Sequence, residues 1–414
     1  MRLHHILHSF TILSVTMLAA GLASSSTSWA QDTASSATHD VSKTFDETVH
    51  LNQIQIIGTH NSYRAAMSPV TMQWLSKVAP EAAITLDYHH APLAVQLDHG
   101  VRQVELDLYA DMQGGRYAHP KGPDWLRKAG LTPETDPVDP AIMQGNDFKV
   151  MHIVDIDQRS TCQPLKACLS IIRNWSDAHP GHLPIFIDLE TKQSAPPGKA
   201  PFTQPEIFTP ATYDRLDAEL LDVFGRNRIL TPDDVRGDAP DLNTAIRSKG
   251  WPSLARARGK IVLVFERPHD TARYLVGHPA LKGRLIFPNG RPGEPTCAFT
   301  EINEGFVGKK IGEFEAVDNA KAAKIVPDLV RQGYLIRTRA DGDTLEARHN
   351  DLARRQTAFE DGAQLISTDY PLYAPARWHD YSVSFPGGAM MRCNPVNAPD
   401  ACRDSALEPT TPKL

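Results

Sequence analysis

Short hydrophobic runs alternate with amphipathic stretches along most of the chain. Eight of these runs are almost continuously apolar, which is typical of strands buried on both faces of a parallel sheet. Eight strands with interspersed helices over about 330 residues predict a single α/β domain with a (β/α)8 TIM-barrel-like fold. A doubly wound open sheet is the alternative, although no glycine-rich phosphate loop follows the first run. The runs lie at Ile54–Ile57, Val101–Leu108, Lys149–Ile153, Pro184–Leu189, Lys260–Phe265, Arg284–Phe287, Tyr334–Thr338 and Gln364–Ser367.

Helical periodicity marks three segments between the predicted strands. Apolar residues recur at helical spacing within Leu165–His179, Thr209–Gly225 and Thr344–Glu360. The second segment opens with a Thr-Pro pair and closes with glycine, which are common signals for the start and end of a helix. Two stretches rich in Gly, Pro and polar residues, Ala110–Asp147 and Gln193–Pro205, are predicted to be long loop insertions.

The two ends of the chain depart from this alternation. Residues 1–30 carry Arg2, an apolar run at Phe10–Leu22 and a small-residue cleavage site at Ser28–Ala30, which predicts a secretory signal peptide. An uncleaved amphipathic start is the alternative. Residues 31–50 are polar and predict a flexible lead-in. We expect the barrel at residues 51–373 and a disulfide-tied C-terminal extension at residues 374–414.

Composition narrows the class of protein. The chain has 414 residues, and 43 Lys and Arg against 49 Asp and Glu give a formal net charge of −6. Proteins that coat nucleic acid are usually basic, so we expect no nucleic-acid partner. The acidic balance is compatible with a metal ion and with a neutral or small anionic substrate. We expect a monomer.

Five cysteines fit an oxidising compartment, so we expect a secreted or periplasmic protein. Cys162 and Cys168 lie six positions apart, and Cys393 and Cys402 lie nine apart. Two local disulfides are the simplest pairing and leave Cys297 free, although spacing alone does not exclude other pairings. A zinc site is the weaker interpretation, because no Cys/His cluster has ligand spacing.

Polar side chains gather where the predicted strands end, which is where a barrel of this kind carries its active site. Burying so much charge costs several kcal/mol for each uncompensated ion, and a bound cation would compensate it. An all-oxygen ligand set of Asn61, Glu105, Asp107 and Glu190 favours Ca²⁺ or Mg²⁺ over zinc. From the first to the fourth strand, the side chains are His60 and Asn61, Glu105 and Asp107, His152, and Glu190.

Each of these residues also has a structural interpretation. A lone histidine at a strand end often only hydrogen-bonds within the fold, and a Glu-x-Asp pair commonly forms an ion pair. For the remaining polar strand ends, a salt bridge at the rim and a substrate contact are equally compatible with the sequence; these residues are Glu266, Arg337, Arg339 and Asp369. We take Lys192, Arg337 and Asp369 as the candidate substrate contacts.

Two histidines and a hard cation suit the cleavage of a phosphodiester. One imidazole can remove a proton from a hydroxyl nucleophile while the other protonates the leaving oxygen. The cation lowers the pKa of the attacking hydroxyl and neutralises charge on the phosphoryl oxygens. His60 and His152 are therefore the candidate catalytic residues.

These residues lie in motifs that together resemble the phosphoinositide-specific phospholipase C superfamily, and most closely its secreted, calcium-dependent microbial branch. The resemblance implies a distorted TIM barrel with His60 as general base and His152 as general acid. It also implies Ca²⁺ as cofactor, bound by Asn61, Glu105, Asp107 and Glu190. The motifs are Ile57–Tyr63 (IGTHNSY), Val104–Asp107 (VELD), His152–Asp157 (HIVDID), Leu183–Glu190 (LPIFIDLE) and Gly362–Tyr370 (GAQLISTDY).

The substrate implied by the resemblance is a phospholipid at a membrane or micelle surface. Phosphatidylinositol is expected rather than its polyphosphorylated forms, with diacylglycerol and inositol (cyclic) phosphate as products. The metal-independent bacterial members are similar but carry an arginine where the cation would be. Glu105 and Asp107 lie at that point of this sequence and favour a metal.

Two alternatives remain open. A glycerophosphodiester phosphodiesterase shares the barrel, the paired histidines and the cation, but such enzymes usually open with His-Arg-Gly, whereas Asn61-Ser62 follows His60 here. A non-catalytic secreted barrel that binds phospholipid or polyol with a structural Ca²⁺ is the second alternative. Intact His60 and His152 argue against it, because a binding protein needs no proton donor and acceptor.

Overall fold

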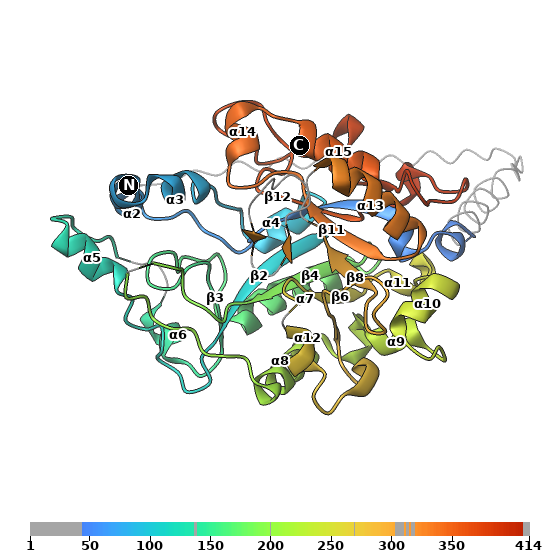
Figure 1. The fold of residues 1–414 in the computed structure, drawn as a ribbon, viewed down its shortest axis with the longest axis horizontal. Helices are drawn as coiled ribbons and strands as arrows, with labels where there is room; N and C mark the ends of the chain where they lie inside the picture. The colour runs from blue at the N-terminus through green and yellow to red at the C-terminus, as the bar shows by residue number, and fades with distance from the viewer. Residues whose placement is uncertain are drawn as a thin grey trace, which may run out of the picture. The chain divides into compact units, whose positions relative to one another are not determined.

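The computed structural model describes residues 44–135, 139–198, 200–268, 270–302, 310–311, 314–315 and 319–408 (Figure 1). The predicted signal peptide lies outside these ranges, as does the lead-in up to residue 43. Within residues 44–50, Phe45 and Val49 are buried in the hydrophobic core, and Asp46 lies 2.7 Å from Arg258. Packed structure therefore begins before residue 51, the expected start of the barrel.

Eight parallel strands make the barrel. Hydrogen bonding runs from β1 through β2, β4 and β6 to β7, and in the other direction from β1 through β12 and β11 to β8. A parallel bridge between Asn289 and Phe299 joins β7 to β8. The predicted TIM-barrel-like fold is confirmed. The strands are β1 (Ile54–Thr59), β2 (Gln103–Ala110), β4 (Ile185–Thr191), β6 (Ile261–Phe265), β7 (Ile286–Phe287), β8 (Phe299–Glu301), β11 (Leu335–Arg339) and β12 (Leu365–Thr368).

The contact between β1 and β2 depends on a glycine. Gly58 is the register partner of Gln103, and a Cβ atom at Gly58 would lie 1.9 Å from Oε1 of that glutamine. No side chain fits in this space, so the two strands that carry His60 and Glu105 approach each other only because position 58 is glycine.

One predicted barrel strand is wrong. The run Lys149–Ile153 forms the shorter β3 (Phe148–Val150), which pairs antiparallel with the end of β2. The physical reason lies in the connection, because a parallel return needs a crossover, usually a helix packed on the sheet. Among its described residues, the insertion before β3 supplies only two short helices, α5 (Gly122–Lys128) and α6 (Pro140–Gln144). The missing barrel strand is β8, whose three residues give no recognisable hydrophobic run.

Helices cover the outside of the barrel (Figure 1). Two predicted helices are confirmed as α7 (Leu165–Ala178) and α8 (Pro210–Phe224). The third is split into α14 (Leu345–His349) and α15 (Ala353–Asp361), because Asn350 adopts a left-handed backbone conformation (φ 51°) that ends α14. The others are α2 (Pro69–Val78), α3 (Pro80–Thr85), α4 (Leu93–Asp98), α9 (Pro232–Arg236), α10 (Leu242–Ser248), α11 (Leu254–Ala257), α12 (Asp270–Tyr274) and α13 (Asn319–Arg331). None of the helices in the described ranges is long and apolar enough to cross a bilayer.

The C-terminal extension packs on both ends of the barrel: Tyr381 bonds to Ala340 and Asp341 just after β11, and the last part packs on the end opposite His60. Its strand β13 (Met391–Cys393) pairs antiparallel with the first half of β1, and Glu408 lies 2.9 Å from Arg102. Both predicted disulfides are present, Cys162–Cys168 and Cys393–Cys402, and Cys297 is free and buried. The remaining short strands are β5 (Ile229–Leu230), paired with β6, and the hairpin of β9 (Lys310–Ile311) and β10 (Phe314–Glu315).

Candidate active site

His60 lies at the mouth of the barrel, directly after β1. The turn continues through Asn61, whose backbone is left-handed (φ 48°), a conformation that asparagine tolerates better than most residues. Nδ1 of His60 is 2.9 Å from Oδ1 of Asp369, which follows β12, the strand paired with β1. Asp369 also accepts a hydrogen bond of 3.2 Å from Arg339 at the end of β11. Three neighbouring strands therefore fix this imidazole.

The surroundings of His60 keep it neutral. Burial lowers the pKa of His60 well below its ordinary value, and the positive charges of Arg339 and Arg337 lower it further. A neutral imidazole that donates from Nδ1 to Asp369 carries its lone pair on Nε2. His60 can therefore accept a proton at neutral pH.

His152 lies in the loop that follows β3 rather than at the end of a barrel strand. Its Nδ1 is 2.9 Å from Oδ2 of Asp157, and the same oxygen accepts a hydrogen bond of 2.8 Å from Nε of Arg64. Burial alone would raise the pKa of Asp157, but Arg64 and His152 outweigh it and hold the pKa below its ordinary value. A charged carboxylate thus orients the second imidazole.

The loop that carries His152 is anchored at Asp155. Its carboxylate accepts hydrogen bonds from the backbone N–H groups of Lys121, at 3.1 Å, and of Thr203, at 2.6 Å. Lys121 and Thr203 belong to the two predicted loop insertions. A Cβ atom at Gly122 would lie 2.3 Å from the carbonyl oxygen of Asp155, so glycine is required at this contact.

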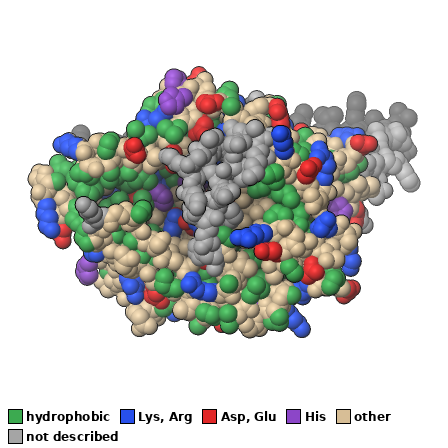
Figure 2. Space-filling model, viewed as in Figure 1, with side chains coloured by type: hydrophobic (Ala, Val, Ile, Leu, Met, Phe, Trp, Pro, Cys, Tyr) green, Lys and Arg blue, Asp and Glu red, His purple; other side chains and the backbone are tan. Residues whose placement is uncertain are grey.

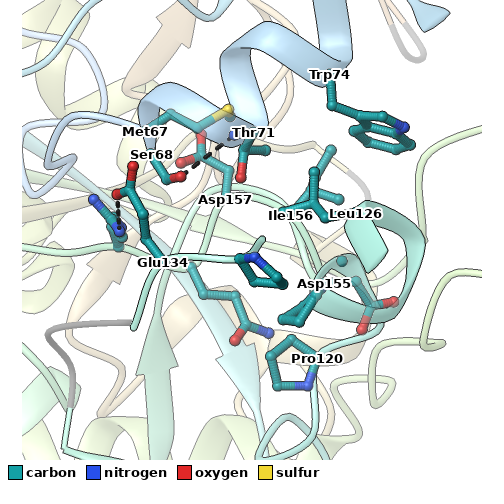
Figure 3. Close-up of a pocket in the computed structure, with 15 residues that line it drawn as sticks. Met67, Ser68, Thr71, Trp74, Pro120, Leu126, Glu134, Asp155, Ile156 and Asp157 are labelled. Atoms are coloured by element: carbon teal, nitrogen blue, oxygen red, sulfur yellow. Dashed lines mark hydrogen bonds and ion pairs between the residues drawn. The ribbon is translucent and has the colours of Figure 1, made fainter. Parts of the chain in front are cut away.

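A small cavity of about 110 Å³ lies beside this loop (Figure 3). Asp155 and Asp157 line it together with apolar side chains of α2 and α5, among them Trp74 and Leu126. Asp157 therefore lines this cavity and also contacts His152 and Arg64.

Six carboxylates and three basic side chains are packed at the mouth of the barrel. If all are ionised, six negative and three positive charges leave this cluster of described residues with a formal charge of −3. The carboxylates are Glu105 and Asp107 on β2, Asp188 and Glu190 on β4, Glu266 after β6, and Glu301 on β8. The basic side chains are Lys192, Arg267 and Arg337.

Each basic side chain bridges particular carboxylates. Nζ of Lys192 is 2.9 Å from Oδ2 of Asp107 and also contacts Glu190. Nε of Arg267 donates to Glu190 at 2.8 Å. The amide of Asn61 is best placed with its nitrogen toward Asp107, 2.9 and 3.2 Å from the two carboxylate oxygens. Both carboxylate oxygens of Asp107 thus have a hydrogen-bond or ion-pair partner.

Arg337 is almost completely buried and lies among three carboxylates. Its guanidinium contacts Glu105 and lies 3.2 Å from Asp188 and 2.7 Å from Glu301. Even so, burial raises the pKa of Glu105 well above its ordinary value; Arg337 opposes the rise, and Asp188 and Asp107 add to it. The basic residues therefore do not offset the cost of burying an ionised Glu105 beside the other carboxylates.

The histidines and much of the cluster line one cavity of about 370 Å³, a volume typical of small-molecule sites. Every candidate substrate contact lines this cavity, and all three are also ion-paired within the protein, Lys192 with Asp107 and Glu190. Asp369 holds His60, and Arg337 holds the carboxylates. Residues of the cavity wall include His60, Asn61, His152, Glu190, Lys192, Glu266, Arg267, Glu301, Arg337, Arg339 and Asp369.

Comparison with known proteins decides the family. The profile of the family "Phosphoinositide phospholipase C, Ca²⁺-dependent" matches residues 49–395, which is most of the chain. The chain belongs to this phospholipase C family. No curated protein sequence matches the chain.

Solved phospholipase C structures are similar to this chain at low identity. One is the calcium-dependent phosphoinositol-specific phospholipase C of the Gram-negative bacterium Pseudomonas sp, with 18% identity, 84% of this chain and 96% of that chain covered, and a TM-score of 0.48. Another is the Ca²⁺-dependent phosphatidylinositol-specific phospholipase C of Streptomyces antibioticus, with 19% identity, 78% and 95% coverage, and a TM-score of 0.45.

As a member of this family, the chain is a phosphoinositide phospholipase C-type enzyme whose cofactor is Ca²⁺. The barrel mouth fits a hard cation. Glu105, Glu190 and Glu266 each offer an oxygen, and the three atoms lie within 4.8 Å of one another. Oε1 of Glu105 and Oε2 of Glu266 are buried without a hydrogen-bond partner among the described residues. Calcium takes oxygen ligands of this kind.

Three further residues contact the candidate site residues or their partners and have no role that the sequence indicates. Asp157 is the last residue of the HIVDID motif, and its place five residues after His152 is the one sequence signal for its contact with that histidine. Arg64 lies shortly after the His60-Asn61-Ser62 turn, and no feature of the sequence indicates its contact with Asp157. For Glu266 the sequence is equally compatible with a salt bridge at the rim and a substrate contact. In the structure, Val264 pairs with Asp188, so Glu266, two residues later, lies level with Glu190.

Proposed function

We propose that the enzyme cleaves phosphatidylinositol-type phospholipids to diacylglycerol and inositol (cyclic) phosphate, with His60 as general base and His152 as general acid. One observation carries the proposal. Both imidazoles line the same cavity, and each is held through Nδ1, at 2.9 Å, by a buried carboxylate: Asp369 for His60 and Asp157 for His152. This arrangement directs Nε2 of each imidazole away from its carboxylate; Nε2 of His60 lies 3.2 Å from the amide of Asn61 and 3.4 Å from Nη1 of Arg339.

In the proposed reaction, Nε2 of His60 removes the proton from the inositol hydroxyl next to the phosphodiester. The hydroxyl oxygen then forms a bond to phosphorus, and the bond from phosphorus to the diacylglycerol oxygen breaks. His152 donates its proton to that departing oxygen, while Asp157 stabilises the charged imidazolium that precedes the transfer. When bound, Ca²⁺ supplies positive charge that favours the ionised hydroxyl and the charged phosphoryl oxygens.

The remaining predicted roles are also part of this proposal. Asn61, Glu105, Asp107 and Glu190 form the ligand set expected from the family resemblance. Lys192 is the proposed contact to the phosphate or to inositol hydroxyls, since it lines the cavity on a flexible stem. Arg337 and Asp369 line the same cavity, but their ion pairs suit them to hold the cluster and His60 in position.

A lipid surface is the proposed setting of the reaction. Ile84 and Leu345 are 40% and 45% exposed, close to Thr85 and Asp343 on the cavity wall. The hydroxyl of Thr344 donates to the carbonyl of Ile84 at 2.8 Å, so the segments that carry Ile84 and Leu345 are in contact. Hydrophobic side chains also gather over α2 and α5, at the left of Figure 2.

Vesicle cosedimentation tests this setting. The double variant Ile84→Ser/Leu345→Ser should bind phosphatidylinositol vesicles more weakly than the wild-type protein. The control is Leu221→Ser on α8, where an equally exposed leucine belongs to a helix that contributes nothing to the cavity wall. Equal vesicle binding by all three proteins would contradict a membrane contact at this rim.

Export to the periplasm or the medium is proposed from the predicted signal peptide, and the two disulfides support it because such bonds persist in oxidising compartments. A monomer without a nucleic-acid partner remains the expectation.

The decisive experiment is ³¹P NMR of phosphatidylinositol and of glycerophosphoinositol incubated with the purified chain, with and without EGTA. The proposal expects an inositol phosphate resonance from phosphatidylinositol that requires calcium. Cleavage of glycerophosphoinositol alone would instead favour a glycerophosphodiester phosphodiesterase. Full turnover in excess chelator would contradict the calcium requirement.

A further inference from the structure

A buried carboxylate supports the residue that holds His60. Asp341 follows the end of β11 by two residues and is completely buried. β11 and β12 lie side by side (Figure 1), so Asp341 reaches the end of β12. Its Oδ1 accepts a hydrogen bond of 2.9 Å from the backbone N–H of Asp369, and its Oδ2 accepts one from the hydroxyl of Thr368. Asp341 therefore binds both the main chain of Asp369 and the side chain that precedes it.

The C-terminal extension provides a third donor to the same carboxylate. The hydroxyl of Tyr381 lies 3.2 Å from Oδ2 of Asp341 and 3.2 Å from the carbonyl oxygen of Ala340. Tyr381 is only 1% exposed, and its ring packs edge-on against that of Tyr370, with 5.9 Å between the ring centroids. The backbone N–H of Val383 also donates to the carbonyl of Tyr370 at 2.8 Å. The extension is thus held against the residues that follow both strands.

Asp341 contacts the support of His60 without contacting the substrate cavity. It is not one of the described residues that line the cavity shared by His60 and His152. A buried carboxylate lowers stability unless its hydrogen bonds are made, and two of the three donors here belong to Thr368 and Asp369. Asp369 in turn lies 2.9 Å from Nδ1 of His60. A change at Asp341 should therefore reach His60 through Asp369.

We propose that Asp341 is a positioning residue for the general base. It holds Asp369 in the orientation that fixes His60 with its proton on Nδ1, and Tyr381 of the C-terminal extension holds Asp341 in turn. The inference rests on the proposed function, because His60 is the base proposed there. It gives the extension, which lies outside the barrel strands, a part in the reaction.

Steady-state kinetics on phosphatidylinositol test the proposal. Asp341→Asn keeps the shape of the side chain but leaves a single oxygen to accept hydrogen bonds. We expect kcat to fall by roughly 10- to 100-fold, because small displacements of a reacting group are costly, and KM to change by less than about twofold. Tyr381→Phe removes one of the three donors, so its kcat should fall by about two- to fivefold. A raised KM with an unchanged kcat would overturn the proposal.

A double variant shows whether Asp341 acts through Asp369. Asp341→Asn/Asp369→Asn should have the same kcat as Asp369→Asn alone, because a support contributes nothing once the group that it supports is gone. Losses that multiply would mean that the two carboxylates act independently, and would overturn the proposal.

Asp217→Asn is the matched control. Asp217 on α8 is also buried, and it also accepts a hydrogen bond from a tyrosine hydroxyl, that of Tyr274 at 2.7 Å. It is not among the described residues of the cavity wall. This variant should melt at a lower temperature and keep the wild-type kcat below its melting temperature. A loss of kcat as large as that of Asp341→Asn would show that general destabilisation is responsible, and would overturn the proposal.

NMR of ¹⁵N-labelled histidine side chains, recorded without lipid, observes His60 directly. The wild-type protein should carry a proton on Nδ1 of His60, and this proton should exchange faster with water in Asp341→Asn. An unchanged exchange rate would overturn the positioning role alone. A wild-type protein that shows the Nδ1 proton but leaves phosphatidylinositol intact would contradict the proposed function and, with it, the base role on which the inference rests.

Thermal unfolding shows whether each variant is folded. If Asp341→Asn does not fold, Tyr381→Phe replaces it in the double variant with Asp369→Asn and in the NMR experiment. A smaller kcat that is absorbed by Asp369→Asn then supports the proposal, and an unchanged kcat overturns it.

Discussion

The two histidines of the cavity have the same local geometry but are held by different kinds of structure. His60 stands on β1, and its carboxylate and arginine come from β12 and β11, so the barrel itself sets its position. His152 stands in a loop beyond β3 and depends on Asp157 in the same loop. Each Nδ1 nevertheless lies 2.9 Å from a buried carboxylate oxygen.

This difference shows that the second residue of a proton-transfer pair need not lie on a barrel strand. Parallel strands deliver side chains to one mouth, and they supply the proposed base and the carboxylate cluster. The proposed acid comes from an insertion that needs its own supports. These are Arg64 behind Asp157 and the two loops that bind Asp155. Mutations of the supporting residues should therefore change the position of His152 more easily than that of His60.

Removal of either imidazole should have the largest effect. His60→Ala and His152→Ala should each lower kcat on phosphatidylinositol by roughly 10²–10⁴-fold, the usual contribution of a positioned acid or base. A nitrophenyl phosphodiester of inositol has a good leaving group and needs no acid. It should restore much of the activity of His152→Ala and little of that of His60→Ala. Equal restoration of both variants would show that the two roles are assigned wrongly.

Loss of the orienting carboxylates should have the next largest effect. Asp369→Asn and Asp157→Asn should each lower kcat by roughly 10²-fold or more, because the amide no longer enforces the tautomer that the proton transfer needs. Asp157→Asn should also lower the melting temperature, since a buried ion pair that loses one partner costs about 3–5 kcal/mol. Arg64, its partner, is completely buried.

Asp124→Asn is the control for this pair of variants. Asp124 lies 2.5 Å from Arg127, but both side chains are largely exposed. Exposed pairs contribute little to stability, so neither kcat nor the melting temperature should change. An Asp157→Asn protein that melts like the wild type would contradict the stabilising role given to the Arg64–Asp157 pair.

The same contrast explains what the sequence could predict. The strand that leads to His60 is a continuous apolar run, and period-two alternation correctly placed Glu105 and Asp107 on one side of β2. The segment before His152 has an equally apolar pattern, but that pattern does not distinguish a parallel from an antiparallel partner. Pairing is decided by the connecting insertion, whose path depends on long-range contacts such as that of Asp155 with Thr203.

The site was predictable in outline because barrel strands bring their ends together. Which carboxylate meets which cation was not predictable, because Lys192, Arg267 and Arg337 reach their partners through side-chain conformations. The short β8 was missed for a simpler reason. Three residues are too few for any hydrophobic period to be recognised.

The pH dependence of kcat/KM and of stability should reveal the low pKa of His60. The pKa of His60 is well below the ordinary value of about 6.5. The pH at which kcat/KM decreases on the acidic side should therefore lie below about 6.5. The unfolded chain binds a proton at this position near pH 6.5 while folded His60 does not. The contribution of His60 to stability should therefore fall as the pH drops below 6.5.

Arg339→Gln tests the electrostatic part of this effect, because Arg339 is the charge that most strongly lowers the pKa of His60 after burial. The acidic limb, measured with a soluble substrate, should move to higher pH in this variant. Arg339→Lys keeps the positive charge and should leave the limb where it is. An acidic limb of the wild type at or above pH 6.5 would contradict a depressed pKa.

The smallest expected effect concerns the two disulfides, which lie on different parts of the barrel. Cys162–Cys168 ties the segment after Asp157 to α7, whereas Cys393–Cys402 closes a loop next to β13 at the far end. Replacing either pair by serines should cost about 2–3 kcal/mol of unfolding free energy, as expected for short loops.

Only the first pair should also affect catalysis. The backbone N–H of Thr161 donates to the carbonyl of Tyr63 at 2.7 Å, which joins the segment after Asp157 to the turn that precedes Arg64. Without Cys162–Cys168 this segment is held less firmly, and kcat should fall by about two- to tenfold through a looser His152. The Cys393–Cys402 variant should keep its kcat below its melting temperature. Equal losses of kcat in both variants would mean that general destabilisation, rather than the support of the His152 loop, limits the reaction.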